Sequence, residues 1–124
     1  MAFYEHLPIY KKSIDLNIWF EKIVRNFSRY NKYTLGTEAR NLSRNITMMI
    51  VKANSAREKL PVLLDIRQRL EELKILIRVA KETKALKSFK SFEYAMREIV
   101  DISRQNEGWI RSQKEAKEQI TPGV

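Results

Sequence analysis

Lysine and arginine residues gather in two stretches of the chain, residues 22–44 and 74–97. These stretches hold thirteen of the 24 basic residues but only three acids, so they account for the whole net charge of +9. Clustered ammonium and guanidinium groups bind phosphates, and nucleic acid is the commonest polyanion that such surfaces meet. The residues that we predict to bind nucleic acid are Lys22, Arg25, Arg29, Lys32, Arg40, Arg44, Arg78, Lys81, Lys84, Lys87 and Lys90.

Most of these cations lack an acid of their own helix to pair with. An acid three or four residues before a base stabilises a helix by about 0.2–0.5 kcal/mol. Arg29 and Lys32 have no such acid, nor do Arg40 and Arg44, and residues 81–90 hold four lysines against one glutamate. Unpaired cations repel each other, and a bound polyanion would offset that repulsion. The alternative is a basic surface that only keeps the protein soluble.

Other arginines have acids at helical spacing and are predicted to be neutralised. The expected pairs are Glu21–Arg25, Glu93–Arg97, Asp101–Arg104 and Glu107–Arg111. We therefore expect a structural role for the arginines at 97, 104 and 111.

Aromatic residues lie close to the basic stretches in the sequence. Tyr33, in the first predicted turn, could stack on an unpaired base. Phe27, Phe89 and Phe92 are expected to belong to the core. Because no groove-reading motif is present, we expect binding to be weakly sequence-specific and sensitive to salt.

The sequence offers little for catalysis. It contains no cysteine and one histidine, His6, so thiol nucleophiles, zinc–thiolate sites and di-iron sites are excluded. Gly36 and Gly108 stand alone and form no phosphate-binding loop. We predict no metal, no cofactor and no enzymatic activity.

The elements that must position the cations are predicted to be four helices. Apolar residues recur at spacings of three and four over residues 8–30, 35–57, 61–84 and 91–115, and the tail 118–124 is expected to fray. The third helix has the most regular stripe, which is Leu63, Ile66, Leu70, Leu73, Ile77 and Ala80. We predict one domain, residues 1–124, folded as an all-α, antiparallel up-down four-helix bundle with shallow left-handed crossing. Both basic stretches then straddle turns at the same end.

The helices carry more apolar surface than one core stripe requires. The residues outside the expected stripes that we predict to contact another subunit are Ile18, Trp19, Met48, Ile50, Val51 and Leu76. Wide apolar surfaces of this kind favour a homo-oligomer. The alternative is a wide stripe buried inside a single bundle.

Three segments of the chain carry a distinctive pattern of residues. Residues 22–38 read KIVRNFSRYNKYTLGTE, residues 87–93 read KSFKSFE, and residues 104–109 read RQNEGW. These segments resemble the accessory variability determinant (Avd) proteins of diversity-generating retroelements. The resemblance covers residues 6–113 and extends to the four-helix-bundle proteins encoded within 23S ribosomal RNA genes. The ending of the third segment favours the retroelement group.

The resemblance implies a pentameric barrel of four-helix bundles that binds a reverse transcriptase and nucleic acid. Such proteins have no catalysis of their own and assist mutagenic synthesis of cDNA from a template RNA. The basic positions that fall within the matching segments are Lys22, Arg25, Arg29, Lys32, Lys87 and Lys90. For the other five predicted cations, the expectation that they bind nucleic acid depends on the charge pattern alone.

Two further functions stay open from the sequence. The chain could be a stand-alone RNA-binding bundle of the 23S intervening-sequence type, or a protein-only adaptor for an acidic partner.

No apolar run approaches the about 20 residues that span a bilayer, and residues 1–10 lack the apolar segment of a signal peptide. We therefore expect a cytoplasmic protein that binds RNA and possibly DNA and does not contact membranes.

Overall fold

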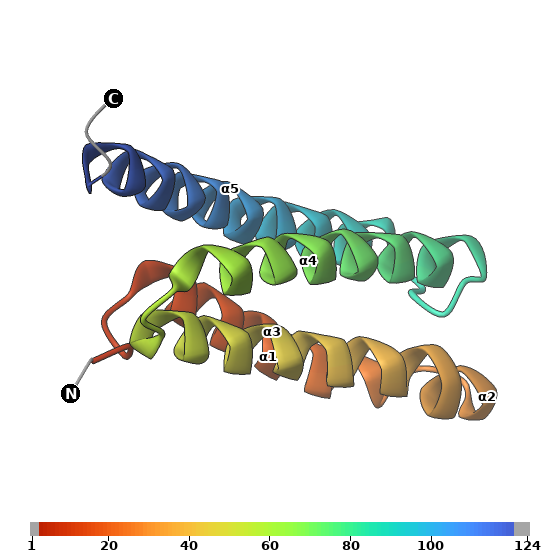
Figure 1. The fold of residues 1–124 in the computed structure, drawn as a ribbon. Coiled ribbons are helices and arrows are strands. Elements are labelled where there is room, and N and C mark those ends of the chain that lie inside the picture. Colours follow the sequence, from red (N-terminus) through yellow and green to blue (C-terminus); the bar gives the residue numbers. More distant parts are fainter. Residues whose placement is uncertain (1–2, 121–124) are drawn as a thin grey trace.

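The computed structural model describes residues 3–120, with side chains up to residue 118, and every regular element in that range is a helix. The elements are α1 (Pro8–Val24), α2 (Arg29–Asn31), the π-helix η1 (Lys32–Gly36), α3 (Thr37–Ser55), α4 (Lys59–Glu82) and α5 (Phe89–Ile120). α1, α3, α4 and α5 are long and lie alongside one another (Figure 1). The predicted all-α class is confirmed, with four long helices in the described part of the chain.

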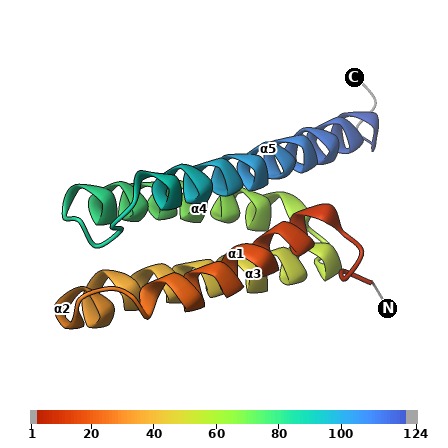
Figure 2. The same ribbon diagram turned by 180° about the vertical axis from the view of Figure 1, so that it is seen from behind.

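The turns of the chain gather at the two ends of this assembly. The segment between α1 and α3, residues 25–36, and the segment between α4 and α5, residues 83–88, lie at the same end in both views (Figures 1 and 2). The short connection between α3 and α4 lies at the other end, together with the N-terminal segment. We call the end with residues 25–36 and 83–88 the basic pole.

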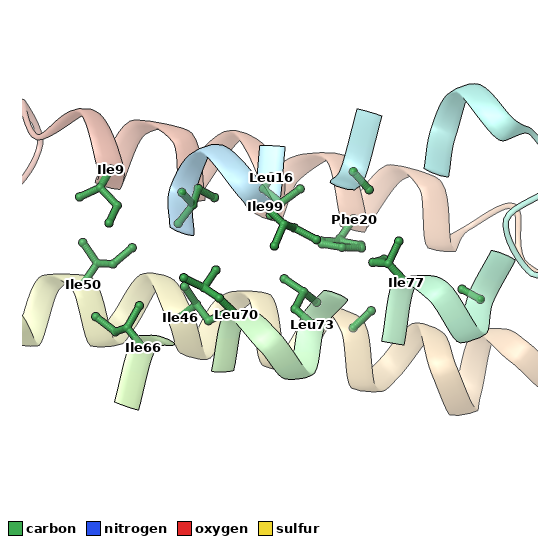
Figure 3. Close-up of a cluster of buried hydrophobic side chains, with 14 of the residues drawn as sticks. Ile9, Leu16, Phe20, Ile46, Ile50, Ile66, Leu70, Leu73, Ile77 and Ile99 are labelled. Atoms are coloured by element: carbon green, nitrogen blue, oxygen red, sulfur yellow. The ribbon is translucent and has the colours of Figure 1, made fainter. Parts of the chain in front are cut away.

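The core runs through the middle of the four helices. Every member of the predicted stripe on α4, from Leu63 to Ala80, is buried. Figure 3 shows Phe20 of α1, Ile46 of α3, Leu73 of α4 and Ile99 of α5 among these buried side chains. Because all four helices contribute, the ends of the helices, and therefore the turns, are held in place.

The first helix is shorter than the sequence pattern predicted. α1 ends at Val24 rather than Tyr30, and the chain turns before Ser28, whose hydroxyl accepts a hydrogen bond from the amide of Asn31 at 3.4 Å. The Thr34 hydroxyl donates to the carbonyl of Tyr30 at 2.8 Å and does not cap α3. The π-helix η1 runs directly into α3, so no cap separates the two.

Close packing at Gly36 accompanies the π-helix. A Cβ atom added to this glycine would lie 2.5 Å from Cγ1 of Val24. Only a residue without a side chain allows the end of α1 and the start of α3 to approach so closely.

The last helix begins close to where the pattern placed it but ends later. The Ser88 hydroxyl accepts a hydrogen bond from the amide of Ser91 at 3.1 Å and so caps α5. The helix continues to Ile120, whereas the pattern predicted an end near residue 115 and a frayed tail from residue 118. Residues 121–124 of that tail lie outside the described residues.

One of the predicted subunit contacts is wrong. Ile50 is 0% exposed and belongs to the core of its own chain, so the alternative of a wide buried stripe holds for this residue. Trp19 is half-buried, with its ring centroid 5.2 Å from that of Phe20. Val51 and Leu76 are also half-buried.

Candidate nucleic-acid interface

The basic pole brings together two segments that lie about sixty residues apart in the sequence. A surface groove there is lined by Ile23, Asn26 and Phe27 at the end of α1, and by Ala85, Lys87, Ser88 and Ser91 around the start of α5. The packing of four helices therefore places the two predicted basic stretches side by side at their turns. This juxtaposition is the geometric condition on which a shared phosphate-binding surface depends.

Two of the predicted cations are paired at this end of the molecule. Arg40 and Arg44 of α3 both form ion pairs with Glu21 of α1, Arg40 at 3.5 Å. The expected Glu21–Arg25 pair is therefore wrong, because α1 and α3 pack side by side and the carboxylate reaches across instead of along its own helix. Glu21 lies one residue before the basic stretch, which is why a count within the stretch missed it.

The remaining cations of the pole are free of acids. Among the described residues, eight predicted cations form neither an ion pair nor a side-chain hydrogen bond, namely Lys22, Arg25, Arg29, Lys32, Arg78, Lys84, Lys87 and Lys90. All are exposed except Lys32, which is half-buried. Lys81 is only loosely paired, at 3.9 Å from Glu82 of its own helix. These side chains can reach phosphates without first breaking an ion pair.

Two cations of α4 lie close to aromatic rings of α5. The Lys81 ammonium lies 4.8 Å from the ring centroid of Phe92, and the Arg78 guanidinium lies 5.9 Å from the same centroid. Phe27 is buried and Phe92 is half-buried against the core. Phe89, which the sequence assigned to the core, is 60% exposed, so that prediction is wrong. Phe89 is the first residue of α5, and its ring lies beside the Lys81 ammonium of α4, 5.6 Å from the ring centroid.

Tyr33 keeps the exposure that base stacking would require. It lies in η1 rather than in an irregular turn, and it is 70% exposed. Short π-helical segments are frequent at functional sites. Tyr33 therefore stays a candidate for contact with a base.

The turn between α4 and α5 is closed by backbone hydrogen bonds and by the Thr83 hydroxyl, which donates to the carbonyl of Val79 at 2.8 Å. The amide of Thr83 donates to the carbonyl of Val79 at 2.9 Å, and the amide of Leu86 donates to that of Ala80 at 3.0 Å. Lys84 adopts a left-handed conformation with φ of 64°, where glycine is usually found. This tight turn holds Lys84 and Lys87 at the end of the bundle.

A family model described as bAvd-like matches residues 7–113. The chain belongs to the bAvd-like family. Families of this Avd type consist in general of non-catalytic accessory proteins, and the resemblance seen in the sequence is confirmed. No curated protein matches the chain.

In this family member the arginines of α5 are not neutralised as predicted. Glu107 accepts two hydrogen bonds from Arg67 of α4, both at 2.8 Å, and these bonds lower the pKa of Glu107. Lys12 of α1 binds Glu98 at 3.1 Å and Asp101 at 3.3 Å, and the hydrogen bonds to Glu98 and then to Asp101 raise the pKa of Lys12. Glu98, Asp101 and Glu107 of α5 therefore pair with residues of neighbouring helices.

Arg104 loses its expected partner because Asp101 pairs with Lys12, and Arg97 forms no ion pair with Glu93, so both arginines lack acidic partners among the described residues. They line a groove that also contains Lys12, Glu98 and Asp101, so the groove carries charges of both signs. The partner of Asp101 could not be predicted from the sequence, because it depends on which faces of the helices meet.

The described residues offer no other evident chemical site. No three histidine, aspartate or glutamate side chains among them come together to hold a metal ion. No helix in residues 3–120 is long and apolar enough to cross a membrane.

Proposed function

We propose that this chain is a non-catalytic accessory protein of a diversity-generating retroelement. In this proposal it binds the element's reverse transcriptase together with RNA or cDNA, and so supports mutagenic cDNA synthesis in the cytoplasm. The family match over residues 7–113 supports the accessory role. The observation that carries the nucleic-acid part is the set of eight predicted cations without an ion pair, which lie in or near the two turns of the basic pole.

The basic pole would hold the nucleic-acid backbone by its phosphates. Each Lys or Arg that neutralises a phosphate releases a condensed counterion, so affinity falls steeply as salt rises. The pole presents helix ends and turns rather than a helix that fits a groove, so little of the contact would read sequence. Binding through this surface is therefore expected to tolerate many sequences.

Oligomer formation is the second part of the proposal. The bundle would be antiparallel up-down with shallow left-handed crossing, and several copies, five by resemblance, would present several basic poles at once. Ile18 and Met48 are 48% and 68% exposed, and Ile75 of α4 is 63% exposed, which leaves apolar surface for subunit contacts. The half-buried Trp19, Val51 and Leu76 could join them. Multivalency would then raise a weak affinity per pole.

The test of phosphate binding is the double variant Arg29→Glu with Lys32→Glu. We expect filter binding to single-stranded RNA to weaken, and the slope of log affinity against log salt to flatten by about 1.4, at about 0.7 per lost phosphate contact. The matched control is Lys52→Glu with Arg57→Glu. It makes the same change in net charge with two exposed, unpaired residues near the other end of the bundle. Binding curves that are equal for the two variants across the salt series would overturn the proposal.

The polymerase part needs a separate experiment. Co-expression with a reverse transcriptase encoded next to this chain, followed by pull-down with and without nuclease, is expected to recover the complex in both cases. Recovery only without nuclease would show that nucleic acid, rather than a direct contact, joins the two proteins.

A further inference from the structure

Phe89 occupies an unusual position for an apolar ring. It is the first residue of α5 and is 60% exposed, although burying a phenylalanine side chain is worth about 1.5–3 kcal/mol. Its one aromatic neighbour among the described residues is Phe92, at 6.0 Å between ring centroids. The fold therefore leaves most of this ring in contact with water.

The surroundings of Phe89 are cationic. The ring lines a groove together with Lys81, Lys84, Leu86, Lys87 and Ser88. The ammonium of Lys81 lies 5.6 Å from the ring centroid. No acid occurs from residue 83 to residue 92, and Glu82 already lies within 3.9 Å of Lys81. The ligand that fits this groove carries negative charge and also offers a flat apolar face.

We propose that Phe89 is a stacking platform for one base of a single-stranded nucleic acid, with the adjoining phosphates held by Lys84 and Lys87. This inference rests on the proposed nucleic-acid binding and gives it a specific subsite. Sites for single strands combine a positively charged groove with exposed aromatic rings on which bases stack. A duplex keeps its base faces stacked inside, so the subsite would favour single strands.

The test compares two ligands that have the same phosphates. One is an oligothymidylate, and the other is an abasic DNA strand of equal length. We expect the wild-type protein to bind the oligothymidylate more tightly. Phe89→Ala should lose about tenfold in affinity for the oligothymidylate, within the range measured for base–aromatic stacking, and almost nothing for the abasic strand. The salt slope should stay unchanged, because no phosphate contact is removed.

Three variants keep this test specific. Phe89→Trp retains a stacking surface and should bind as tightly as the wild type, whereas Phe89→Leu retains bulk without a π-face and should behave like Phe89→Ala. Phe3→Ala removes a 65% exposed ring from the N-terminal segment, at the other end of the bundle, and should change nothing.

The outcomes separate this inference from the proposed function. If the wild-type protein binds both strands equally, or if Phe89→Leu binds as well as the wild type, stacking is overturned while phosphate binding stands. If the wild-type protein binds neither strand at low salt, both the subsite and the proposed nucleic-acid function are overturned.

Discussion

The turns at the two ends of the bundle use lysine in different ways. In the turn between α3 and α4, the Lys59 ammonium donates hydrogen bonds to the carbonyls of Ala53, Asn54 and Ala56, at 3.0, 2.7 and 3.0 Å. In the turn between α4 and α5, Lys84 and Lys87 make no such bonds within the described residues, and backbone amides together with the Thr83 hydroxyl close the helix end.

This difference separates the structural cations of the chain from the available ones. Lys59 donates to carbonyls at the end of α3, where the regular hydrogen bonds of the helix run out, although the carbonyl of Ala53 also accepts from the amide of Ala56 at 3.3 Å. Its charge also opposes the negative end of the helix dipole. The ammonium groups of Lys84 and Lys87 in the basic pole are exposed, so they are available to contact solvent or a ligand. Net charge alone cannot make this distinction, because both kinds of lysine count equally.

The largest expected effect is on stability, at the end of the bundle away from the basic pole. Lys59→Met should lower the free energy of unfolding by about 1.5–3 kcal/mol, since it removes charge-assisted hydrogen bonds to three carbonyls. Urea unfolding followed by circular dichroism measures this change. RNA binding at a temperature where the variant is folded should stay within a factor of two of the wild type.

Lys52→Met is the matched control, because Lys52 is exposed and unpaired in α3. It removes the same charge and should leave stability unchanged. If Lys59→Met weakened RNA binding as much as the loss of a lysine at the pole, total charge rather than its placement would govern binding, and the comparison would fail.

A smaller effect is expected at Lys84, where stability and binding should move in opposite directions. The left-handed backbone at φ of 64° costs a non-glycine residue about 1–2 kcal/mol, so Lys84→Gly should stabilise the fold by about 1 kcal/mol. The same change should weaken RNA binding, because one free cation is lost.

Lys84→Ala isolates the charge. It keeps the left-handed strain and should show the loss of affinity without the gain in stability, as measured by urea unfolding and filter binding. Equal affinity of the wild-type, Gly and Ala proteins would show that this lysine takes no part in binding.

The smallest effect concerns the cations that the fold has already paired. Glu21→Gln should free Arg40 and Arg44 and raise RNA affinity about twofold, while stability falls by about 0.2–1 kcal/mol. Asp65→Asn, an equal charge change at an exposed, unpaired residue of α4, is the control in the same filter-binding assay. An equal gain in affinity for both variants would show that the ion pairs do not withhold the two arginines.

The helical class and the α4 stripe could be predicted because they depend on local periodicity. Residues 63–80 place apolar side chains at regular spacings of three and four, and every one of the stripe residues is buried. The end of α1 could not be predicted, because Phe27 and Tyr30 continue the apolar spacing while the chain has already turned and Tyr30 is exposed.

The charge pairing within the site could be predicted only in part. The sequence placed the cations at the correct turns, but each helix was read in isolation. Glu21 pairs with α3 and Glu107 pairs with α4, because the rotation of each packed helix decides which acids it presents to its neighbours. The exposure of Phe89 could not be predicted either, because an apolar residue at the start of a helix fits a buried and an exposed position equally well in the sequence.

Ultraviolet cross-linking of a 4-thiouridine RNA to the protein, followed by mass spectrometry of the linked peptides, tests the account most directly. The unpaired cations predict cross-links within residues 25–36 and 83–92, which are the two turns of the basic pole and the first turn of α5. Cross-links concentrated on residues 56–59, or along the arginines of α5 from residue 97 to residue 111, would contradict it.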